Sequence, residues 1–121
     1  MAYNERLAER VRAELAGRRG LAERRMFGGL AFLLDGKMCA GVLGDELIVR
    51  CGAERYAESL KSPHAREMDF TGRPMTGMVY VSPAGVSRGA ALRRWIELGI
   101  AGAEAAPSSK RSRRKKAPPR R

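Results

Sequence analysis

The sequence predicts an α+β domain in two layers, with a mostly antiparallel β-sheet and helices packed on one face. Three observations lead to this class. Apolar residues recur at helical spacing near the start and near the end of the first 106 residues. Between these regions, short apolar or alternating runs indicate strands. Tight turns join several of these runs, and hairpins favour antiparallel pairing. The expected element order is α-β-β-β-α-β-β-α, followed by a basic tail.

The first element is a helix, predicted from about residue 2 to residue 17. Its apolar side chains recur every four residues and so share one face, while charged residues fill the other faces. These apolar residues are Tyr3, Leu7, Val11 and Leu15. Gly17 and Gly20 are expected to end the helix.

Three strands are predicted next, at residues 23–34, 37–43 and 46–51. Asp35-Gly36 is a strong hairpin signal, because a type I′ turn needs positive φ at both central residues. Gly44-Asp45 is a slightly weaker one. If these two residues form the turn, Leu43 faces Glu46 and the strands either side of the turn pair in a defined register.

The Gly28-Gly29 pair raises a choice between a phosphate-binding loop and a bend in a strand. A phosphate-binding loop precedes a helix, whose N-terminal amides meet the anion. Here an apolar run and a hairpin follow, and neither the GxGxxG nor the GxxxxGK[ST] spacing is present. We therefore expect the pair to bend the first strand, either as a β-bulge or where a helix crosses close over the sheet.

The remaining elements are a short helix at about 53–60, strands at 67–70 and 77–82, and a last helix at about 87–103. The two strands are separated by a run of turn residues. The last helix is expected to present four side chains to the core: Leu92, Trp95, Ile96 and Ile100.

Charge divides the chain into an expected domain, residues 1–106, and an expected disordered tail, residues 107–121. The tail carries eight basic residues and no acidic one: Lys110, Arg111, Arg113, Arg114, Lys115, Lys116, Arg120 and Arg121. Of the 24 basic residues of the chain, 16 thus remain in residues 1–106, against 13 acidic ones. Like-charge repulsion, three prolines and the lack of an apolar anchor predict disorder in the tail.

These eight cations predict sequence-independent affinity for DNA or RNA, because each neutralised phosphate releases counterions. Reading of base edges would need a helix or strand in a groove. The tail also lacks an aromatic residue to stack on bases. A tail that only aids solubility is the alternative. An acidic membrane surface is disfavoured, since no apolar or lipidated anchor accompanies the charges. Arg24-Arg25 and Arg93-Arg94 could extend a basic surface on the domain.

Several classes of protein are disfavoured. No apolar stretch approaches the roughly 20 residues of a membrane span, and the N-terminus lacks a secretory signal, so we expect a cytoplasmic protein.

Cys39 and Cys51 lack metal-ligand spacing and are expected to be buried free thiols pointing to opposite faces of the sheet. No metal and no cofactor is expected. His64 lies in a loop without a nucleophile motif, so no catalytic residue is assigned.

Three segments together resemble the N-terminal domain of the TfoX/Sxy proteins, bacterial regulators of natural competence. They are "RRMFGGLAFLLDGKMCAGVLGDELIVRCG", "MDFTGRPMTGMVYVSP" and "LRRWIELGIAGA". The resemblance spans residues 1 to about 103. The matching residues are Arg25, Met26, Phe27, Gly28, Gly29, Asp35, Gly36, Gly72, Arg73, Pro74 and Trp95.

The resemblance implies an α+β domain with a mostly antiparallel sheet and no established catalytic residues. Full-length competence regulators of that family carry a second, C-terminal helical domain. We expect this chain to lack it and to end in the basic tail instead.

The function expected from these observations is that of a non-enzymatic regulatory or interaction module. A protein partner or a second copy would bind residues 1–106, and the tail would add non-specific nucleic-acid affinity. The alternative is a protein-binding or small-ligand-binding domain whose tail aids solubility. A large exposed apolar patch would favour this alternative. A concave pocket with a cluster of shifted pKa values would favour an enzyme.

Overall fold

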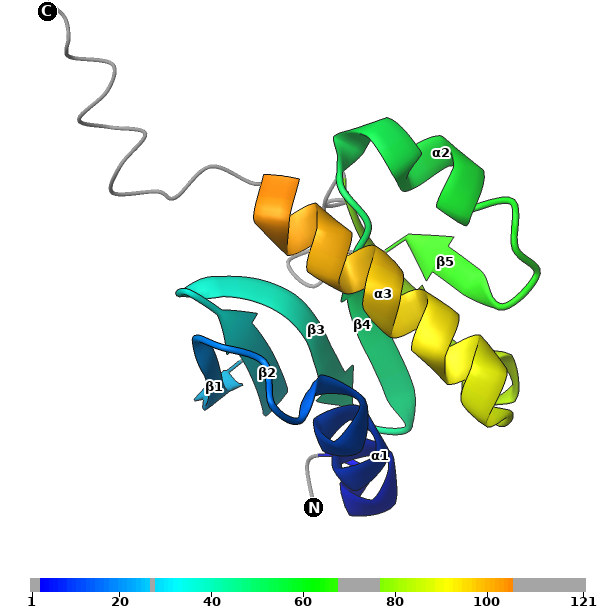
Figure 1. The fold of residues 1–121 in the computed structure, drawn as a ribbon. Coiled ribbons are helices and arrows are strands. Elements are labelled where there is room, and N and C mark those ends of the chain that lie inside the picture. Colours follow the sequence, from blue (N-terminus) through cyan, green and yellow to red (C-terminus); the bar gives the residue numbers. More distant parts are fainter. Residues whose placement is uncertain (1–2, 27, 68–76, 106–121) are drawn as a thin grey trace, which may run out of the picture.

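The computed structural model describes residues 3–26, 28–67 and 77–105. Within them the chain forms a six-stranded antiparallel sheet with three α-helices, so the α+β class is confirmed (Figure 1). The predicted tail residues and Gly72, Arg73 and Pro74 lie outside the described residues. None of the described helices is long and apolar enough to cross a membrane.

The strands follow the order β1-β2-β3-β4-β6-β5 across the sheet. Their bounds are β1 Leu21–Met26, β2 Gly29–Leu34, β3 Lys37–Leu43, β4 Glu46–Arg50, β5 Ala65–Glu67 and β6 Met78–Val81. The α-helices are α1 Glu5–Leu15, α2 Tyr56–Ser59 and α3 Gly89–Ala105. Two short 3₁₀-helices, η1 Ala53–Arg55 and η2 Pro83–Val86, precede α2 and α3.

The predicted single strand at 23–34 is wrong, because it contains two strands and a hairpin. Met26 at the end of β1 pairs with Gly29 at the start of β2. Gly28 has a φ of 82°, a left-handed conformation that glycine adopts without strain. Gly28 therefore lies in the turn that reverses the chain, and Gly29 starts the next strand, so the first run holds four strands where three were expected.

The other predicted hairpins are confirmed. Asp35 and Gly36 have φ values of 54° and 83°, as a type I′ turn requires. Leu43 pairs with Glu46 across the turn that follows β3. The strand predicted at 67–70 begins two residues earlier, at Ala65, and its predicted residues 68–70 lie outside the described part of the chain.

A β-bulge interrupts the pairing of β2 with β3. Phe32 pairs with Ala40 but Leu33 pairs with Met38, which leaves Cys39 as the extra residue. The guanidinium of Arg50, on the neighbouring strand, donates from Nε to the Met38 carbonyl oxygen at 2.5 Å. A bulge leaves part of the ladder unpaired, so this bond satisfies a carbonyl group beside the irregularity.

Helix α1 starts at a side-chain cap. The Oδ1 atom of Asn4 accepts a hydrogen bond of 3.0 Å from the Leu7 amide, one of the amides that a helix N-terminus leaves unpaired. Asn4 also donates from Nδ2 to Asp45 at 3.0 Å, which holds the helix start against the β3–β4 turn. The predicted apolar face is buried at Leu7, Val11 and Leu15.

Helix α3 lies directly on the sheet backbone through two glycines. A Cβ atom built at Gly99 would overlap the carbonyl oxygen of Cys39, and one at Gly102 would overlap that of Arg50. The close crossing of a helix over the sheet, expected near Gly28-Gly29, thus occurs at α3 instead. Leu92, Ile96 and Ile100 of this helix are buried, as the sequence predicts.

The sheet is apolar on both faces, and the helices cover one of them (Figure 1). Along β2, Leu30, Phe32 and Leu34 belong to the cluster shared with α1 and α3. Ala31 and Leu33 point the other way, since strand side chains alternate. They join a second cluster that contains no residue of the described helices: Ala31, Leu33, Met38, Ile48, Met78 and Tyr80.

The two cysteines are free and buried, as predicted. The prediction that they point to opposite faces is wrong, because both belong to the cluster beneath the helices. The bulge explains the difference: the extra residue in β3 turns Cys39 and Ala40 toward the same face. Burial raises the pKa of the Cys39 thiol to about 11 and also raises that of Cys51.

We expect Gly99→Ala to lower the free energy of unfolding, by up to about 2 kcal/mol, measured by urea denaturation. Alanine raises helix propensity by about 1 kcal/mol over glycine. Overpacking costs about 1–3 kcal/mol, and here the obstacle is a strand carbonyl. The matched control is Gly89→Ala in the same helix, where a Cβ meets nothing within 4 Å. Equal stability of the two variants would contradict the close crossing.

We expect the free energy of unfolding to fall as pH rises from about 9 toward 11. The Cys39 thiol ionises near its ordinary pKa of 9.0 once unfolded but only near 11 when folded. The unfolded state therefore binds fewer protons in this window, at up to about 1.4 kcal/mol per pH unit. Cys39→Ala should flatten this part of the urea-denaturation profile, and an unchanged slope would show that Cys39 is not responsible.

Candidate functional site

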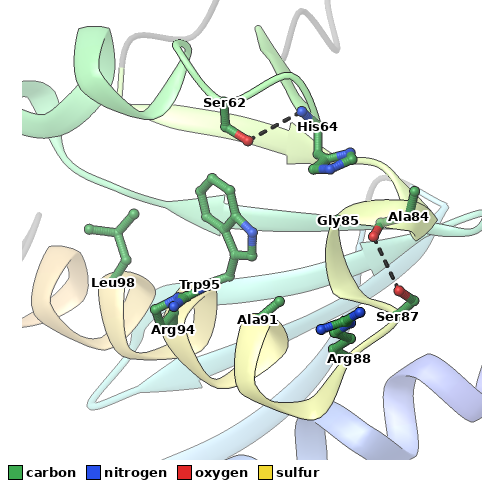
Figure 2. A pocket seen from close by; sticks show the side chains of 10 residues that line it. All are labelled: Ser62, His64, Ala84, Gly85, Ser87, Arg88, Ala91, Arg94, Trp95 and Leu98. Carbon is green, nitrogen blue, oxygen red and sulfur yellow. Dashed lines mark hydrogen bonds between the residues drawn. The ribbon is translucent and has the colours of Figure 1, made fainter.

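A cleft of about 480 Å³ opens between the first half of α3, η2 and the loop that joins α2 to β5. Its walls carry the only histidine and the only tryptophan of the chain (Figure 2). The lining residues are Ser62, His64, Ala84, Gly85, Ser87, Arg88, Ala91, Arg94, Trp95 and Leu98. A volume of this size is typical of small-molecule sites.

Backbone hydrogen bonds fix the rim of the cleft. The Ser82 amide donates to the His64 carbonyl oxygen at 2.8 Å, which joins the start of η2 to the loop before β5. The Gly85 amide donates to Ser82 at 2.9 Å. A Cβ atom at Gly85 would lie 2.6 Å from the Cβ of His64, so η2 reaches this position only with glycine.

Trp95 stands at the centre of the cleft. It follows the buried residue Leu92 by three positions and precedes Ile96, and this places it at the edge of the buried face, where it is half-buried. Figure 2 shows its ring rising from α3 toward the loop that carries Ser62 and His64. An adjoining hollow of about 200 Å³ is also lined by Trp95, together with Ser62 and Leu98.

Among the described residues, the lining of the cleft contains two arginines and no acidic residue. Neither Arg88 nor Arg94 forms a salt bridge within the described part of the chain. Arg93 differs from its neighbour, because its Nε lies 3.2 Å from the Glu14 carboxylate of α1. Of these two adjacent arginines, Arg93 thus contacts α1 and Arg94 lines the cleft.

Among the described residues, no carboxylate or thiol lines the cleft beside Ser62 and His64 to complete a catalytic set. The Ser62 hydroxyl accepts the backbone amide of His64 at 3.2 Å, so the serine is engaged with the backbone. Both thiols lie beneath α3, and burial raises their pKa values, which keeps them protonated near neutral pH. Among the described residues, no three His, Cys, Asp or Glu side chains gather as a metal site would require.

A second hollow of about 500 Å³ lies at the other end of α3, lined in part by Arg50 and Cys51. It is bounded by Gly77 and Ala105, where described segments of the chain end, so the described walls do not define its extent.

A smaller hollow, of about 250 Å³, lies beside the last turn of α3 at Ala103 and Glu104. Arg18, Arg19 and Lys37 line it, with Asp35 as the second acidic residue. Helix α3 ends at Ala105, so the described chain ends next to this group of three basic and two acidic side chains.

The structure brings one of the predicted motif residues, Trp95, into the cleft. Arg25 and Met26 are exposed on β1. Gly29 starts the second strand of the first hairpin, and Asp35 and Gly36 form the turn of the next one. Phe27, Gly72, Arg73 and Pro74 lie outside the described residues, as do all eight basic residues of the tail. No local motif marks Arg88 or Arg94 as cleft residues, because Ser62 and His64, across the cleft, lie 24 to 32 residues away in the chain.

The TfoX N-terminal domain family model matches residues 13–103 of this chain. Searches of curated proteins and of solved structures found no significant match.

We expect iodide to quench the fluorescence of Trp95 more efficiently than caesium does, relative to a free tryptophan derivative. Two unpaired arginines make the cleft positive, and a potential of one kT concentrates an anion about threefold. Trp95 is the chain's one tryptophan, so the signal comes from the cleft alone. Added salt should reduce the preference, because it screens exposed charges.

Arg94→Gln should lower this iodide preference. The matched control, Arg24→Gln, removes the same charge from an exposed position on β1 and should leave the preference unchanged. Equal quenching by both ions in the unsubstituted chain would contradict a positive cleft.

Proposed function

This chain belongs to the TfoX N-terminal domain family, and from that premise we propose that it is a regulatory interaction module that acts without catalysis and binds nucleic acid through its basic tail. The observation that carries the proposal is the distribution of charge. Eight cations and no acid lie in the 15 residues of the tail, while residues 1–106 are nearly balanced. A polyanion gains affinity from such a segment mainly through counterion release.

The fold supports separate roles for the tail, which would bind nucleic acid, and for residues 1–106, which would bind a partner. The described chain ends at Ala105, close to a group of basic and acidic side chains onto which an engaged phosphate chain could continue: Arg18, Arg19 and Lys37, with Asp35 and Glu104. Contacts of this kind position a polyanion but carry no sequence information. In this proposal any sequence preference comes from a protein partner or a second copy bound to residues 1–106. A cytoplasmic location, where nucleic acid is accessible, belongs to the same proposal.

The surface favours recognition by polar and charged groups. Among the described residues, the one exposed large hydrophobic side chain is Met26, with 39% of its surface accessible. An extended apolar docking patch would have favoured a constitutive protein-binding domain. No carboxylate or thiol accompanies His64 among the described lining residues of the cleft, which supports a role without catalysis.

A second candidate function is binding of a small ligand, with a tail that aids solubility. The observation that favours it is the Trp95 cleft, whose volume of about 480 Å³ and mixed apolar and cationic lining suit a small anionic molecule.

We expect the full chain to bind a generic DNA duplex in fluorescence anisotropy, with log K falling steeply as log salt rises. The slope reaches about 0.9 per phosphate engaged, so several tail contacts give a slope of several units. A chain ending at Ala106, and a full chain with the eight tail cations replaced by glutamine, should both lose this binding.

Equal binding of DNA by the full and shortened chains would show that the DNA-binding interface lies on the folded domain. Absence of binding by the full chain at low salt would refute the nucleic-acid role and leave ligand or protein binding as the function.

A further inference from the structure

Arg88 directly precedes α3, and Trp95 lies in the second turn of the helix, on the side that borders the cleft. Arg88, Ala91 and Trp95 are spaced by three and four residues, which aligns them along one side of the helix start. Seven residues of α-helix rise about 10 Å, so this side spans roughly two turns. Ala91 lies between these two residues in the chain and also lines the cleft.

The positive charge of the cleft favours an anionic ligand. Arg88 and Arg94 both line it, neither is paired within the described residues, and no carboxylate lies in the lining to neutralise them. Guanidinium groups bind phosphate through two parallel hydrogen bonds, a geometry that a single ammonium does not offer.

The indole ring of Trp95 favours a ligand with a planar ring that can stack on it. Trp95 lines the cleft and also the adjoining hollow of about 200 Å³, whose lining includes Arg55 and Glu58. Its side chain packs against the core but is only partly buried, unlike Leu92 and Ile96, which are 1% exposed. An accessible indole is a stacking surface for a base, because every nucleobase has a π face.

We propose that this cleft binds a nucleotide, with the base against Trp95 and the phosphate held by Arg88 and Arg94. The side chains of Ser62 and His64 lie across the cleft from α3 and offer polar groups to the edge of the base (Figure 2). The nucleotide is either free or one unit of a single strand, whose bases are open to stacking. The basic tail cannot supply this contact, since it contains no aromatic residue.

The first test titrates the full chain with a nucleoside 5′-monophosphate and follows Trp95 fluorescence, excited where the nucleotide does not absorb. We expect saturable quenching. Arg88→Gln and Arg94→Gln should each weaken binding about tenfold, the effect of losing a charge-assisted hydrogen bond. Both residues are exposed and unpaired in the described structure, so these variants should fold. Arg24→Gln, with the same change of net charge, should bind normally.

Two comparison ligands separate the parts of the proposal. The nucleoside without phosphate should bind much more weakly, and inorganic phosphate should bind without quenching comparable to that of the nucleotide. Absence of saturable quenching, equal effects of Arg24→Gln and Arg94→Gln, or equal binding of nucleotide and inorganic phosphate would each overturn the proposal.

A further experiment distinguishes a free nucleotide from one unit of a single strand. It also tests whether binding in the cleft depends on the tail. The chain with its eight tail cations replaced by glutamine should still bind the mononucleotide, even if duplex binding is lost or never existed. A short single strand that displaces the mononucleotide from this chain identifies the ligand as a unit of a strand. Failure to displace it identifies a free nucleotide. Loss of mononucleotide binding with the tail charges would overturn a site in the cleft.

Discussion

The structure depends on the close approach of α3 to the backbone of β3 and β4. At Gly99 and Gly102 the helix has no Cβ, and it can therefore rest on the carbonyl groups of Cys39 and Arg50. The strand beneath it is bulged at Cys39, and Arg50 bonds to the adjacent Met38 carbonyl. Helix, bulge and arginine thus meet at one place, and a side chain on either glycine would lift the helix from the sheet.

That approach also decides which face of α3 remains available. With the glycines against the strands, Leu92, Ile96 and Ile100 enter the core. The side of the helix that carries Arg94 and Trp95 then turns toward the loop before β5, where it becomes a wall of the cleft. The hydrogen bond between Ser82 and His64 holds the opposite wall. The cleft therefore follows from packing constraints in the core, although its lining residues are mostly at the surface.

Local patterns were enough to predict most of the fold. The Asp35-Gly36 turn and the buried positions of α1 and α3 rest on turn chemistry and on periodicity, which short segments contain in full. The strand at 23–34 was misassigned because β2 is buried on both faces and reads as a continuous apolar run, while β1 is polar and exposed. Nothing in the alternation pattern marks the hairpin between them.

The bulge and the cleft could not be read from the sequence. The bulge at Cys39 shows only in the pairing of β2 with β3, and it reversed the predicted direction of that cysteine. The cleft joins residues near 62, 85 and 95, which are brought together by the pairing of β5 with β6 and by the path of α3. The tail was defined by composition alone, which is a property of the sequence.

Strand β1 has a consequence for how the protein behaves in concentrated solution. It forms one edge of the sheet, and an open edge is a template on which another chain can add a strand. Its consecutive residues Glu23, Arg24 and Arg25 point alternately to the two faces, so both faces of this edge are charged. An added strand would gain backbone hydrogen bonds but would cover little apolar surface, since Met26 is the one large hydrophobic side chain exposed among the described residues. The sheet is thereby protected, at this edge, from growing into an aggregate.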